Sequence, residues 1–456
     1  MQIINPATDK LIKSIDEDTE KVVQTKYQLL REGQLKWKDT DIFDRIAAVK
    51  KFSELLRENV DSLAEILTAE MGKPLSQSRD EIKGACKKIK FFTLESERYL
   101  SGKNVNVDGN THERIVYDPL GIIGNISAWT FPYLVGVGVF IPALIAGNAV
   151  LYKPSEHTTL TGLEIEKYLT LAGVPNDVFQ TVVGGANAGR YLLDLPLDGY
   201  FFTGSNKTGR YIAQRVADKL VPVVLELGGV DPVYICDDVK SLKETAAAVS
   251  EGCFYNNGQS CCATERIYVH KDIYHDFVDL LADETNKLVV GDPLESKTNQ
   301  GPLARKIQKG FLNDQIADAR GKGGRVVTGG NPVGEVGAFF EPTIIADANH
   351  DMKVMKEETF GPVKAVMKVQ DDEQAIALMN DSDFGLTASV FSSDHNRAKL
   401  ILDRVDSGTS YINCLDRVSA YLPWSGRKGS GIGSTHSFHG IYAFCKPRGI
   451  HERMLN

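Results

Sequence analysis

Residues 121–153 read GIIGNISAWTFPYLVGVGVFIPALIAGNAVLYK and carry no charge before the final lysine. The apolar run from Phe131 to Tyr152 is long enough to imitate a membrane span. Pro142 and the Gly147-Asn148 pair instead divide it into a buried helix of about four turns and a buried strand. Because GIIGNIS has the composition of a strand, the stretch predicts a strand–helix–strand unit, and we expect no membrane role.

The same alternation continues along the chain. Further strands are predicted in VFQTVVG, GYFFTG and PVVLELGG, with helices in LTGLEIEKYLTLAG and NKTGRYIAQRVADKL. This spacing is typical of a parallel, doubly wound α/β sheet, in which ligands bind beyond the carboxyl ends of the strands. After Leu227 a second series predicts another α/β domain, with strands in PVYICDD, ATERIYVH, GRVVTGG, FFEPTIIADA, KAVMKVQ, LTASVFSS and TSYINCLD.

Composition narrows the class of protein. The chain has 456 residues, of which 42% are hydrophobic and 25% charged, and this is typical of a globular protein with more than one domain. A net charge of −8 without a block of Lys or Arg disfavours nucleic acid as a partner. The seven cysteines are scattered, which predicts neither a disulfide framework nor a metal site and favours the cytoplasm.

Residues 254–263 read FYNNGQSCCA and place two cysteines side by side. Adjacent cysteines bridge each other poorly, so either the pair is incidental or one sulfur reacts. The small and polar residues before them suit a turn that leads into a helix N-terminus, where the helix dipole would favour a thiolate. The alternative is that Cys261 and Cys262 are small hydrophobic residues of the core.

Three other motifs carry chemistry. Glu226 ends the strand PVVLELGG, where a carboxylate could act as a general base. Gly204 and Ser205 form a strand-to-helix turn whose N–H groups could hold a phosphate, although the motif is not GxGxxG. Lys153 and Glu156 follow a strand and could bind ribose hydroxyls.

Taken together, the motifs resemble the NAD(P)-dependent aldehyde dehydrogenase superfamily, and in particular its shorter bacterial, semialdehyde-dehydrogenase-like members. The resemblance covers essentially the whole chain. It is carried, in the order typical of the family, by INPATDKLI, TAEMGKPL, AWTFP, GNAVLYKPSE, FTGSNKTGR, LELGG, FYNNGQSCCA, EETFGPV, INC and SGRKGSGIG.

The resemblance implies roles for individual residues. Cys261 would be the nucleophile that adds to an aldehyde, Cys262 a bystander, and Glu226 the base that activates water against the resulting thioester. The aldehyde hydrogen would pass to the nicotinamide as hydride. The residues expected to bind the cofactor are Ser127, Trp129, Lys153, Ser155, Glu156, Gly185, Gly189, Phe202, Gly204, Ser205, Thr208, Leu227, Gly228, Glu358 and Phe360.

One position departs from the family. Thr130 replaces the asparagine that would stabilise the oxyanion, and losing such a donor costs about 3 kcal/mol in other acyl-transfer enzymes. We therefore expect a slower enzyme or a shifted substrate, while a catalytically impaired structural homologue stays open as an alternative. A coenzyme A-acylating enzyme is a further alternative, against which the retained Glu226 argues.

Cofactor and substrate follow from side-chain chemistry. The carboxylate of Glu156 would repel a 2′-phosphate, which predicts NAD in preference to NADP. The helix after AWTFP reads YLVGVGVF, with Gly136 and Gly138 but no cation, and predicts a roomy, apolar tunnel for aliphatic or aromatic aldehydes. A semialdehyde dehydrogenase is the alternative. The residues expected to touch the substrate are Phe131, Tyr133, Leu134, Trp424 and Arg417, of which Arg417 could instead pair with Asp416 at the surface.

The resemblance also implies a domain organisation. Residues 1–102 and 119–226 would form a Rossmann-like cofactor domain, and residues 227–432 the catalytic domain. Residues 103–118 and 433–456 would form a small β oligomerisation element, since a hairpin edge can continue a sheet into a partner chain. We expect a homodimer or homotetramer, without a nucleic-acid or membrane partner.

Overall fold

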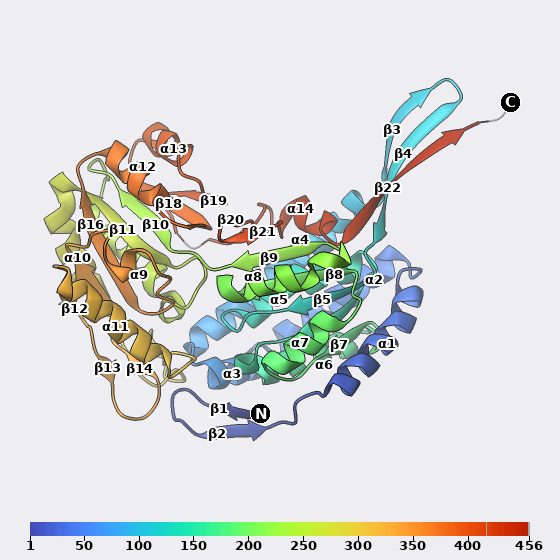
Figure 1. The fold of residues 1–456 in the computed structure, drawn as a ribbon, viewed down its shortest axis with the longest axis horizontal. Coiled ribbons are helices and arrows are strands. Elements are labelled where there is room, and N and C mark those ends of the chain that lie inside the picture. The colour runs from blue at the N-terminus through green and yellow to red at the C-terminus, as the bar shows by residue number, and fades with distance from the viewer. Residues whose placement is uncertain (416, 455–456) are drawn as a thin grey trace.

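The computed structural model describes residues 1–415 and 417–454, and it contains two large, mainly parallel sheets (Figure 1). In the first sheet only β21 is antiparallel to its neighbour. The strand order is β21 (Gly431–Ile432), β9 (Val223–Leu227), β8 (Gly199–Gly204), β5 (Ile122–Ile126), β6 (Ala149–Lys153) and β7 (Phe179–Thr181). These strands confirm those that the sequence predicts between residues 121 and 229.

Alternation of side chains gives this sheet a core on each face. Ile122 and Leu151 belong to one apolar cluster, and their neighbours Ile123 and Val150 belong to another. The first cluster involves α1 (Glu20–Trp37), α7 (Ala186–Asp194) and α8 (Asn206–Val216). The second involves α2 (Ile42–Glu58), α3 (Val60–Met71), α4 (Leu75–Leu100), α5 (Pro132–Ile145) and α6 (Thr159–Leu171).

Helix α5 and strand β6 confirm the interpretation of the uncharged stretch after Phe131. Pro142 lies inside the helix, which ends at Ile145 before Gly147 adopts a positive φ of 95°. Almost every residue of α5 is buried against α2, α4 and the sheet. Within the described residues, we find no helix with both the length and the apolar character needed to span a bilayer.

The second sheet has seven strands, of which only β12 is antiparallel to its neighbour. Their order is β12 (Arg325–Thr328), β15 (Thr343–Ala346), β16 (Val363–Val369), β11 (Thr264–His270), β10 (Asp231–Ile235), β18 (Thr387–Phe391) and β19 (Thr409–Ile412). Its helices are α9 (Leu242–Phe254), α10 (Tyr274–Asn286), α11 (Gln308–Gly321), α12 (Asp372–Asn380) and α13 (His395–Leu402). Both α/β series of the sequence are thus confirmed.

An antiparallel arm projects from the body of the molecule (Figure 1). It consists of β3 (Lys103–Asp108), β4 (Thr111–Pro119) and the C-terminal β22 (Cys445–Arg453), with β4 in the middle. Strands β3 and β4 form the predicted hairpin, in which Asp108 pairs with Thr111 and Gly109, with a φ of 57°, lies in the turn between them. Helix α14 (Ser437–Tyr442) connects the arm to the body by packing on α4 and α5.

Short elements complete the structure. The paired strands are β1 (Gln2–Ile4) with β2 (Leu11–Ser14), β13 (Pro332–Val333) with β14 (Phe339–Phe340), and β17 (Phe384–Gly385) with β20 (Arg427–Lys428). The 3-10 turns are η1 (Glu156–Thr158), η2 (Ala217–Lys219), η3 (Tyr255–Gly258), η4 (Lys271–Ile273) and η5 (Lys353–Met355).

One local prediction is wrong. The stretch FYNNGQSCCA does not lead into a helix N-terminus but leaves α9 through η3 and enters strand β11. Asn256 and Asn257 adopt left-handed conformations, with φ of 53° and 57°, and Gly258 follows at 67°. Asparagine and glycine tolerate this region, so the chain reverses there. Because a strand and not a helix follows Cys261, that segment provides no helix dipole to favour the thiolate.

Candidate active site

A cleft of about 890 Å³ contains most of the residues that the sequence nominates. It collects side chains from loops after β5, β6, β8 and β9 of the first sheet and from the second sheet's domain. The predicted residues that line it are Ser127, Trp129, Thr130, Lys153, Ser155, Glu156, Gly185, Gly189, Phe202, Gly204, Ser205, Thr208, Glu226, Gly228, Cys261, Glu358 and Phe360.

Cys261 is the accessible member of the cysteine pair. Its side chain lines the cleft and is partly exposed, whereas Cys262 is buried and lies 3.4 Å from the hydroxyl of Ser260. Cys262 packs with Leu386 and Trp424 in a small apolar cluster that Cys261 borders. Access therefore distinguishes the two sulfurs, and only Cys261 faces the space that a ligand could enter.

Glu226 projects from β9 into the same cleft. The hydroxyl of Thr435 donates to its Oε1, and that of Thr203, its partner on the adjacent strand β8, donates to Oε2 at 3.4 Å. Burial raises the pKa of Glu226, while these hydrogen bonds and the charge of Lys88 oppose the rise. A carboxyl with a raised pKa is suited to accept a proton near neutral pH.

Hydrogen bonds to the backbone hold the segment around Thr130 in place. The carbonyl of Thr130 accepts from the Lys73 ammonium at 2.7 Å and from the Asn256 amide at 3.3 Å. Lys73 forms a fully buried ion pair with Glu81, whose other oxygen accepts the N–H of Tyr133 at 2.8 Å. The first turn of α5 and the position of Thr130 are thus fastened to α4.

Lys153 and Glu156, which the sequence predicts to bind ribose hydroxyls, also line the cleft. Burial lowers the pKa of Lys153, and the Glu156 charge opposes this. Burial alone would raise the pKa of Glu156, but its own backbone N–H and the Lys153 charge lower it below its usual range. Glu156 therefore stays ionised at neutral pH and presents a carboxylate to the cleft.

Glycine 228 creates space for the next carboxylate. A Cβ at Gly228 would lie 2.1 Å from Oε1 of Glu358, so any side chain would displace Glu358. Glu358 accepts from the N–H of Gly229 at 3.2 Å, and burial, then the charge of Glu265, raise its pKa to about 8. Phe360 stands edge-on to Trp129, with ring centroids 5.5 Å apart.

Six predicted residues lie outside this cleft, and one of them, Tyr133, is fully buried in the core against the first sheet. Leu227 is buried in the core under α8, where a Cβ at Gly209 would meet its side chain at 2.4 Å. The rings of Phe131 and Tyr255 stack with their centroids 6.3 Å apart, and the Lys73 ammonium lies over the Phe131 ring, 3.9 Å from its centroid. Trp424 belongs with Cys262 and Leu386 to the apolar cluster that Cys261 borders. Leu134 is half-buried on α5.

Arg417 is exposed, and its carbonyl accepts from the Tyr411 hydroxyl at 2.8 Å. Its alternative partner, Asp416, lies outside the described residues. A role for Arg417 in substrate binding therefore stays a prediction.

The expected space beside the α5 glycines is filled. A Cβ at Gly136 would meet the ring of Phe140 at 2.7 Å, and one at Gly138 would meet Nε2 of His436 at 3.0 Å. The ammonium of Lys88 lies next to His436, 3.6 Å from the same Cβ position at Gly138. The prediction of roomy space without a cation is wrong at this position because the space is filled by Phe140 of α5 itself, by Lys88 of α4 and by His436, which precedes α14.

Several residues that line the cleft were not predicted from the sequence. They include the basic and aromatic side chains His157, Arg190, Lys207, Tyr211, Arg305 and Phe311. Arg305 lies over the Trp129 ring at 6.0 Å and is bonded to Gln308 at 2.9 Å. Lys207 lies within the motif FTGSNKTGR, and His157 and Tyr211 directly follow recognised motifs, whereas Arg190, Arg305 and Phe311 become neighbours of the site through folding alone.

The cleft fits a dinucleotide. Glu156 and Glu358, the carboxyls expected to hold ribose hydroxyls, line it together with the basic side chains of Lys207 and Arg305. Ser127 has a buried hydroxyl without a hydrogen-bond partner among the described residues. Ser205 caps α8, so this N-terminus faces the cleft and offers N–H groups to a phosphate.

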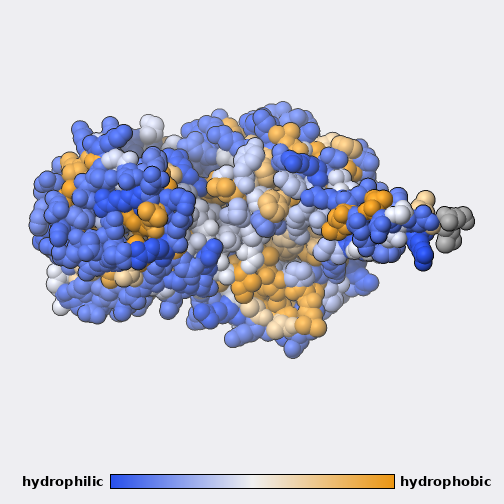
Figure 2. All heavy atoms as spheres, turned by 90° about the horizontal axis from the view of Figure 1, so that it is seen from above, coloured by the Kyte–Doolittle hydropathy of each residue, from blue (hydrophilic) through white to orange (hydrophobic). Residues whose placement is uncertain are grey.

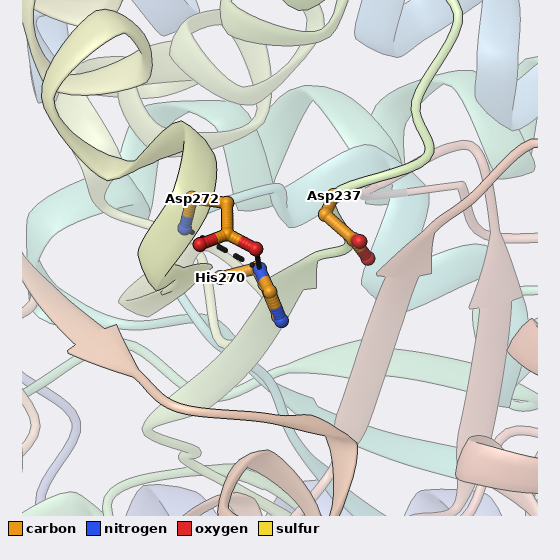
Figure 3. Close-up of side chains that lie close together, drawn as sticks. All are labelled: Asp237, His270 and Asp272. Atoms are coloured by element: carbon orange, nitrogen blue, oxygen red, sulfur yellow. Dashed lines mark hydrogen bonds and ion pairs between the residues drawn. The ribbon is translucent and has the colours of Figure 1, made fainter.

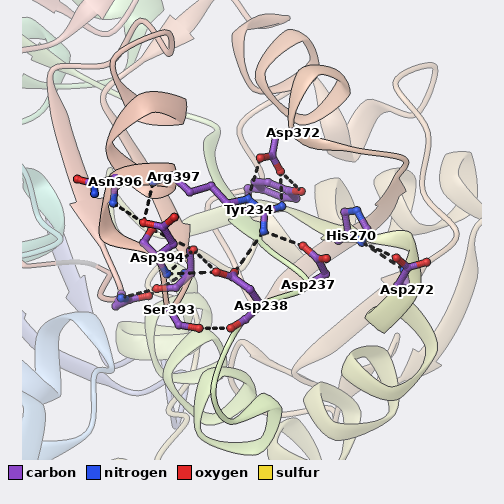
Figure 4. A network of polar contacts seen from close by, with 12 residues as sticks. Tyr234, Asp237, Asp238, His270, Asp272, Asp372, Ser393, Asp394, Asn396 and Arg397 are labelled. Atoms are coloured by element: carbon purple, nitrogen blue, oxygen red, sulfur yellow. Dashed lines mark hydrogen bonds and ion pairs between the residues drawn. The ribbon is translucent and has the colours of Figure 1, made fainter.

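Away from the cleft, Asp237, His270 and Asp272 have donor atoms within 4.8 Å of one another. Figure 3 shows contacts between His270 and Asp272, and none between these two and Asp237. Asp237 is paired with Arg397 at 2.8 Å, and Arg397 also pairs with Asp372 (Figure 4). These contacts join α13 to β10 and α12, and we assign no metal to the cluster.

Comparison with known proteins agrees with this geometry. The profile of the aldehyde dehydrogenase family matches residues 1–450. The chain is 33% identical over 460 residues to an aldehyde dehydrogenase of Agaricus bisporus, covering 100% of this chain and 92% of that protein. It is 33% identical over 442 residues to a succinate-semialdehyde dehydrogenase [NADP(+)] of Deinococcus radiodurans, covering 97% and 92%.

Among solved structures, a betaine aldehyde dehydrogenase of Staphylococcus aureus in complex with NAD+ superimposes with a TM-score of 0.95 at 27% identity, covering 99% of this chain and 94% of that one. Fold and sequence agree over nearly the full length, and the chain therefore belongs to the aldehyde dehydrogenase family.

Proposed function

We propose that the protein oxidises an aldehyde to the carboxylic acid with NAD, using Cys261 as nucleophile and Glu226 as general base. The observation that carries the proposal is the shared cleft, in which Cys261, Glu226 and Thr130 lie with Lys153, Glu156 and Glu358. A thiol and a carboxyl with a raised pKa meet there with groups suited to a dinucleotide.

The steps follow from the chemistry of these side chains. The Cys261 sulfur adds to the carbonyl carbon, and the oxygen takes up negative charge that the Thr130 hydroxyl and the Cys261 N–H would stabilise. When bound in the cleft, NAD would supply the oxidising power as an acceptor for the hydride of that carbon. Glu226 then removes a proton from the water that hydrolyses the resulting thioester, and the sulfur leaves.

We propose NAD in preference to NADP because Glu156 stays ionised where the adenosine ribose would bind. A 2′-phosphate would meet this carboxylate, whereas the hydroxyls of NAD could donate to it. We expect Glu156→Gln to reduce the preference for NAD over NADP by about tenfold, since roughly 1.4 kcal/mol of repulsion corresponds to that factor. The ratio of kcat/KM values for the two cofactors measures it, and an unchanged ratio would contradict the assignment.

For the substrate we propose aliphatic or aromatic aldehydes, because Phe131 and Trp424 are aromatic neighbours of the Thr130 and Cys261 segments. The semialdehyde alternative is supported by the named activity of the Deinococcus radiodurans relative and by a cation, Lys88, within charge–charge reach of Cys261. Activity with hexanal, benzaldehyde and succinic semialdehyde distinguishes the two.

We also propose a homo-oligomer that assembles through the arm of β3, β4 and β22, in the cytoplasm. The supporting features are the position of β3 at the edge of the three-stranded sheet, where the described residues supply no further strand, and its exposed Val105 and Val107, 55% and 62% accessible. Figure 2 shows the arm standing clear of the body, with apolar residues near its base. Light scattering after size exclusion, for the full chain and for Val107→Lys, tests the assembly.

The central experiment measures nicotinamide absorbance with NAD and the three aldehydes. Wild-type protein is expected to turn over, Cys261→Ala to be inactive, and Glu226→Gln to release one equivalent of NADH per site and then stop at the thioester. Lys87→Met, an exposed neighbour on α4, serves as a control. Full activity of Cys261→Ala would exclude the proposed chemistry, and release of product only with coenzyme A would favour acylation.

A further inference from the structure

A buried lysine–histidine pair lies behind the proposed active site and has no part in the mechanism above. Lys88 of α4 is 5% exposed, and its Nζ donates to the carbonyl of Leu134 at 2.8 Å. The same Nζ lies 2.7 Å from Nε2 of His436, which is 4% exposed and precedes α14. Burying an ammonium beside an imidazole costs folding free energy unless hydrogen bonds or opposite charges stabilise the buried charge.

The backbone at His436 is held in an unusual conformation. Its φ of 60° and ψ of 174° fall in a region that is essentially reserved for glycine, and Ser437 follows with a φ of 49°. Thr435, immediately before, donates its hydroxyl to Glu226. The strained turn therefore places the Thr435 hydroxyl on Glu226 and the neighbouring imidazole on Lys88.

Glycine at position 138 makes room for this pair. A Cβ there would lie 3.0 Å from Nε2 of His436 and 3.6 Å from Nζ of Lys88. Helix α5 also provides the Leu134 carbonyl, so α4, α5 and the turn before α14 converge on one ammonium group.

The charges that face Lys88 come from four places. Burial lowers the pKa of Lys88 to about 8, while Glu226, Cys261, Glu81 and Cys262, in decreasing order of effect, oppose this shift. Burial and the Lys88 charge hold the pKa of His436 well below its usual range, so its ring is neutral and Nε2 accepts from the ammonium. Nδ1 of His436 has no hydrogen-bond partner within residues 1–415 and 417–454.

We propose that Lys88, held in place by His436, is a positioning residue whose ammonium stabilises the charged forms of Cys261 and Glu226 together. This inference rests on the proposed roles of those two residues. A thiolate and a carboxylate in one cleft repel each other, and a single cation within reach of both offsets the repulsion. The residue does not itself contact substrate.

The test measures alkylation of Cys261 by iodoacetamide as a function of pH, without cofactor, with peptide mass spectrometry to select that cysteine. Lys88→Met keeps the shape of the side chain and removes the charge. We expect its alkylation rate at pH 7 to fall about tenfold, and the pH profile to move to higher pH, because a one-unit change in ionisation is a factor of ten. Lys87→Met, exposed on the same helix, is expected to match the wild type.

A second variant covers the case in which Lys88→Met does not fold. Gly138→Ala removes no charge, but its new Cβ would displace the side chains of His436 and Lys88. We expect the pH profile of Cys261 alkylation in this variant to move to higher pH by less than in Lys88→Met. Wild-type alkylation profiles in the folded variants would overturn the inference, while wild-type aldehyde oxidation would leave the proposed function standing.

The same variants separate positioning from substrate recognition. We expect Lys88→Met to lower kcat with hexanal and with succinic semialdehyde alike. A rise in KM confined to succinic semialdehyde, with an unchanged alkylation profile, would instead make Lys88 a binding site for the substrate carboxylate and overturn its positioning role.

Discussion

Thr130 is the residue whose chemistry differs most from expectation for the family, and its surroundings define what it can do. The carbonyl of Thr130 already accepts hydrogen bonds from Lys73 and Asn256. The hydroxyl of Thr130 is therefore the polar group that it can offer toward Cys261 in the cleft. We predict that Thr130→Val, which keeps the shape and removes the hydroxyl, lowers kcat about tenfold, less than the loss of a full oxyanion donor. Steady-state rates with hexanal measure the effect.

Thr130→Asn is expected to match or exceed the wild type because its amide reaches further. If Thr130→Val keeps full activity, the Cys261 N–H stabilises the oxyanion without help from position 130. Unfolding curves for both variants serve as the control, since Thr130 is buried and a change in stability could imitate a change in rate.

At the scale of elements, the Lys73–Glu81 ion pair fastens α5 to α4. Both side chains are fully buried, and Glu81 accepts the N–H groups of Tyr133 and Leu134. We predict that Glu81→Gln destabilises the protein by about 3 kcal/mol, because it leaves a buried ammonium without its counter-charge. Urea unfolding measures the loss.

The double variant Lys73→Met/Glu81→Leu is expected to recover part of that stability, because it removes both charges. Asp80→Asn, on the exposed side of α4 beside Lys83, is the matched control and should change stability by less than about 0.5 kcal/mol. Equal effects of Glu81→Gln and Asp80→Asn would contradict the anchoring role.

The elements themselves follow from sequence where periodicity is strong. Strands β5 to β9 and helix α5 are fixed by apolar alternation and by Gly147, and the β3–β4 hairpin by Asp108-Gly109. A turn before Cys261 was predicted, but the left-handed conformation of Asn256 and Asn257 and the strand that follows were not, because consecutive left-handed asparagines resemble any polar loop in sequence. Cys261, Lys153 and Glu226 could be nominated from motifs, whereas Lys88 and Arg305 reach the site only through packing of distant helices and loops.

At the scale of the whole molecule, buried carboxyls link stability to pH. Asp231, at the start of β10, is fully buried against Thr387, and burial raises its pKa to about 8. Between the ordinary pKa of an aspartic acid and about 8, the folded protein holds a proton that the unfolded chain has released. Unfolding therefore releases a proton in this range, and stability falls as pH rises, by up to roughly 1.4 kcal/mol per pH unit for one such group.

Glu358, with a pKa of about 8, acts in the same direction. We predict that the melting temperature of the cofactor-free protein decreases from pH 5 to pH 8, and that Asp231→Asn reduces the slope. The amide keeps the shape of the side chain and cannot titrate, so the variant loses the contribution of this group. Calorimetry in buffers of equal ionic strength measures the slope, with Asp80→Asn as an exposed control. An identical slope in Asp231→Asn and wild type would mean that Asp231 is ionised in the folded protein, and that Thr387 and Arg266 stabilise its charge against burial.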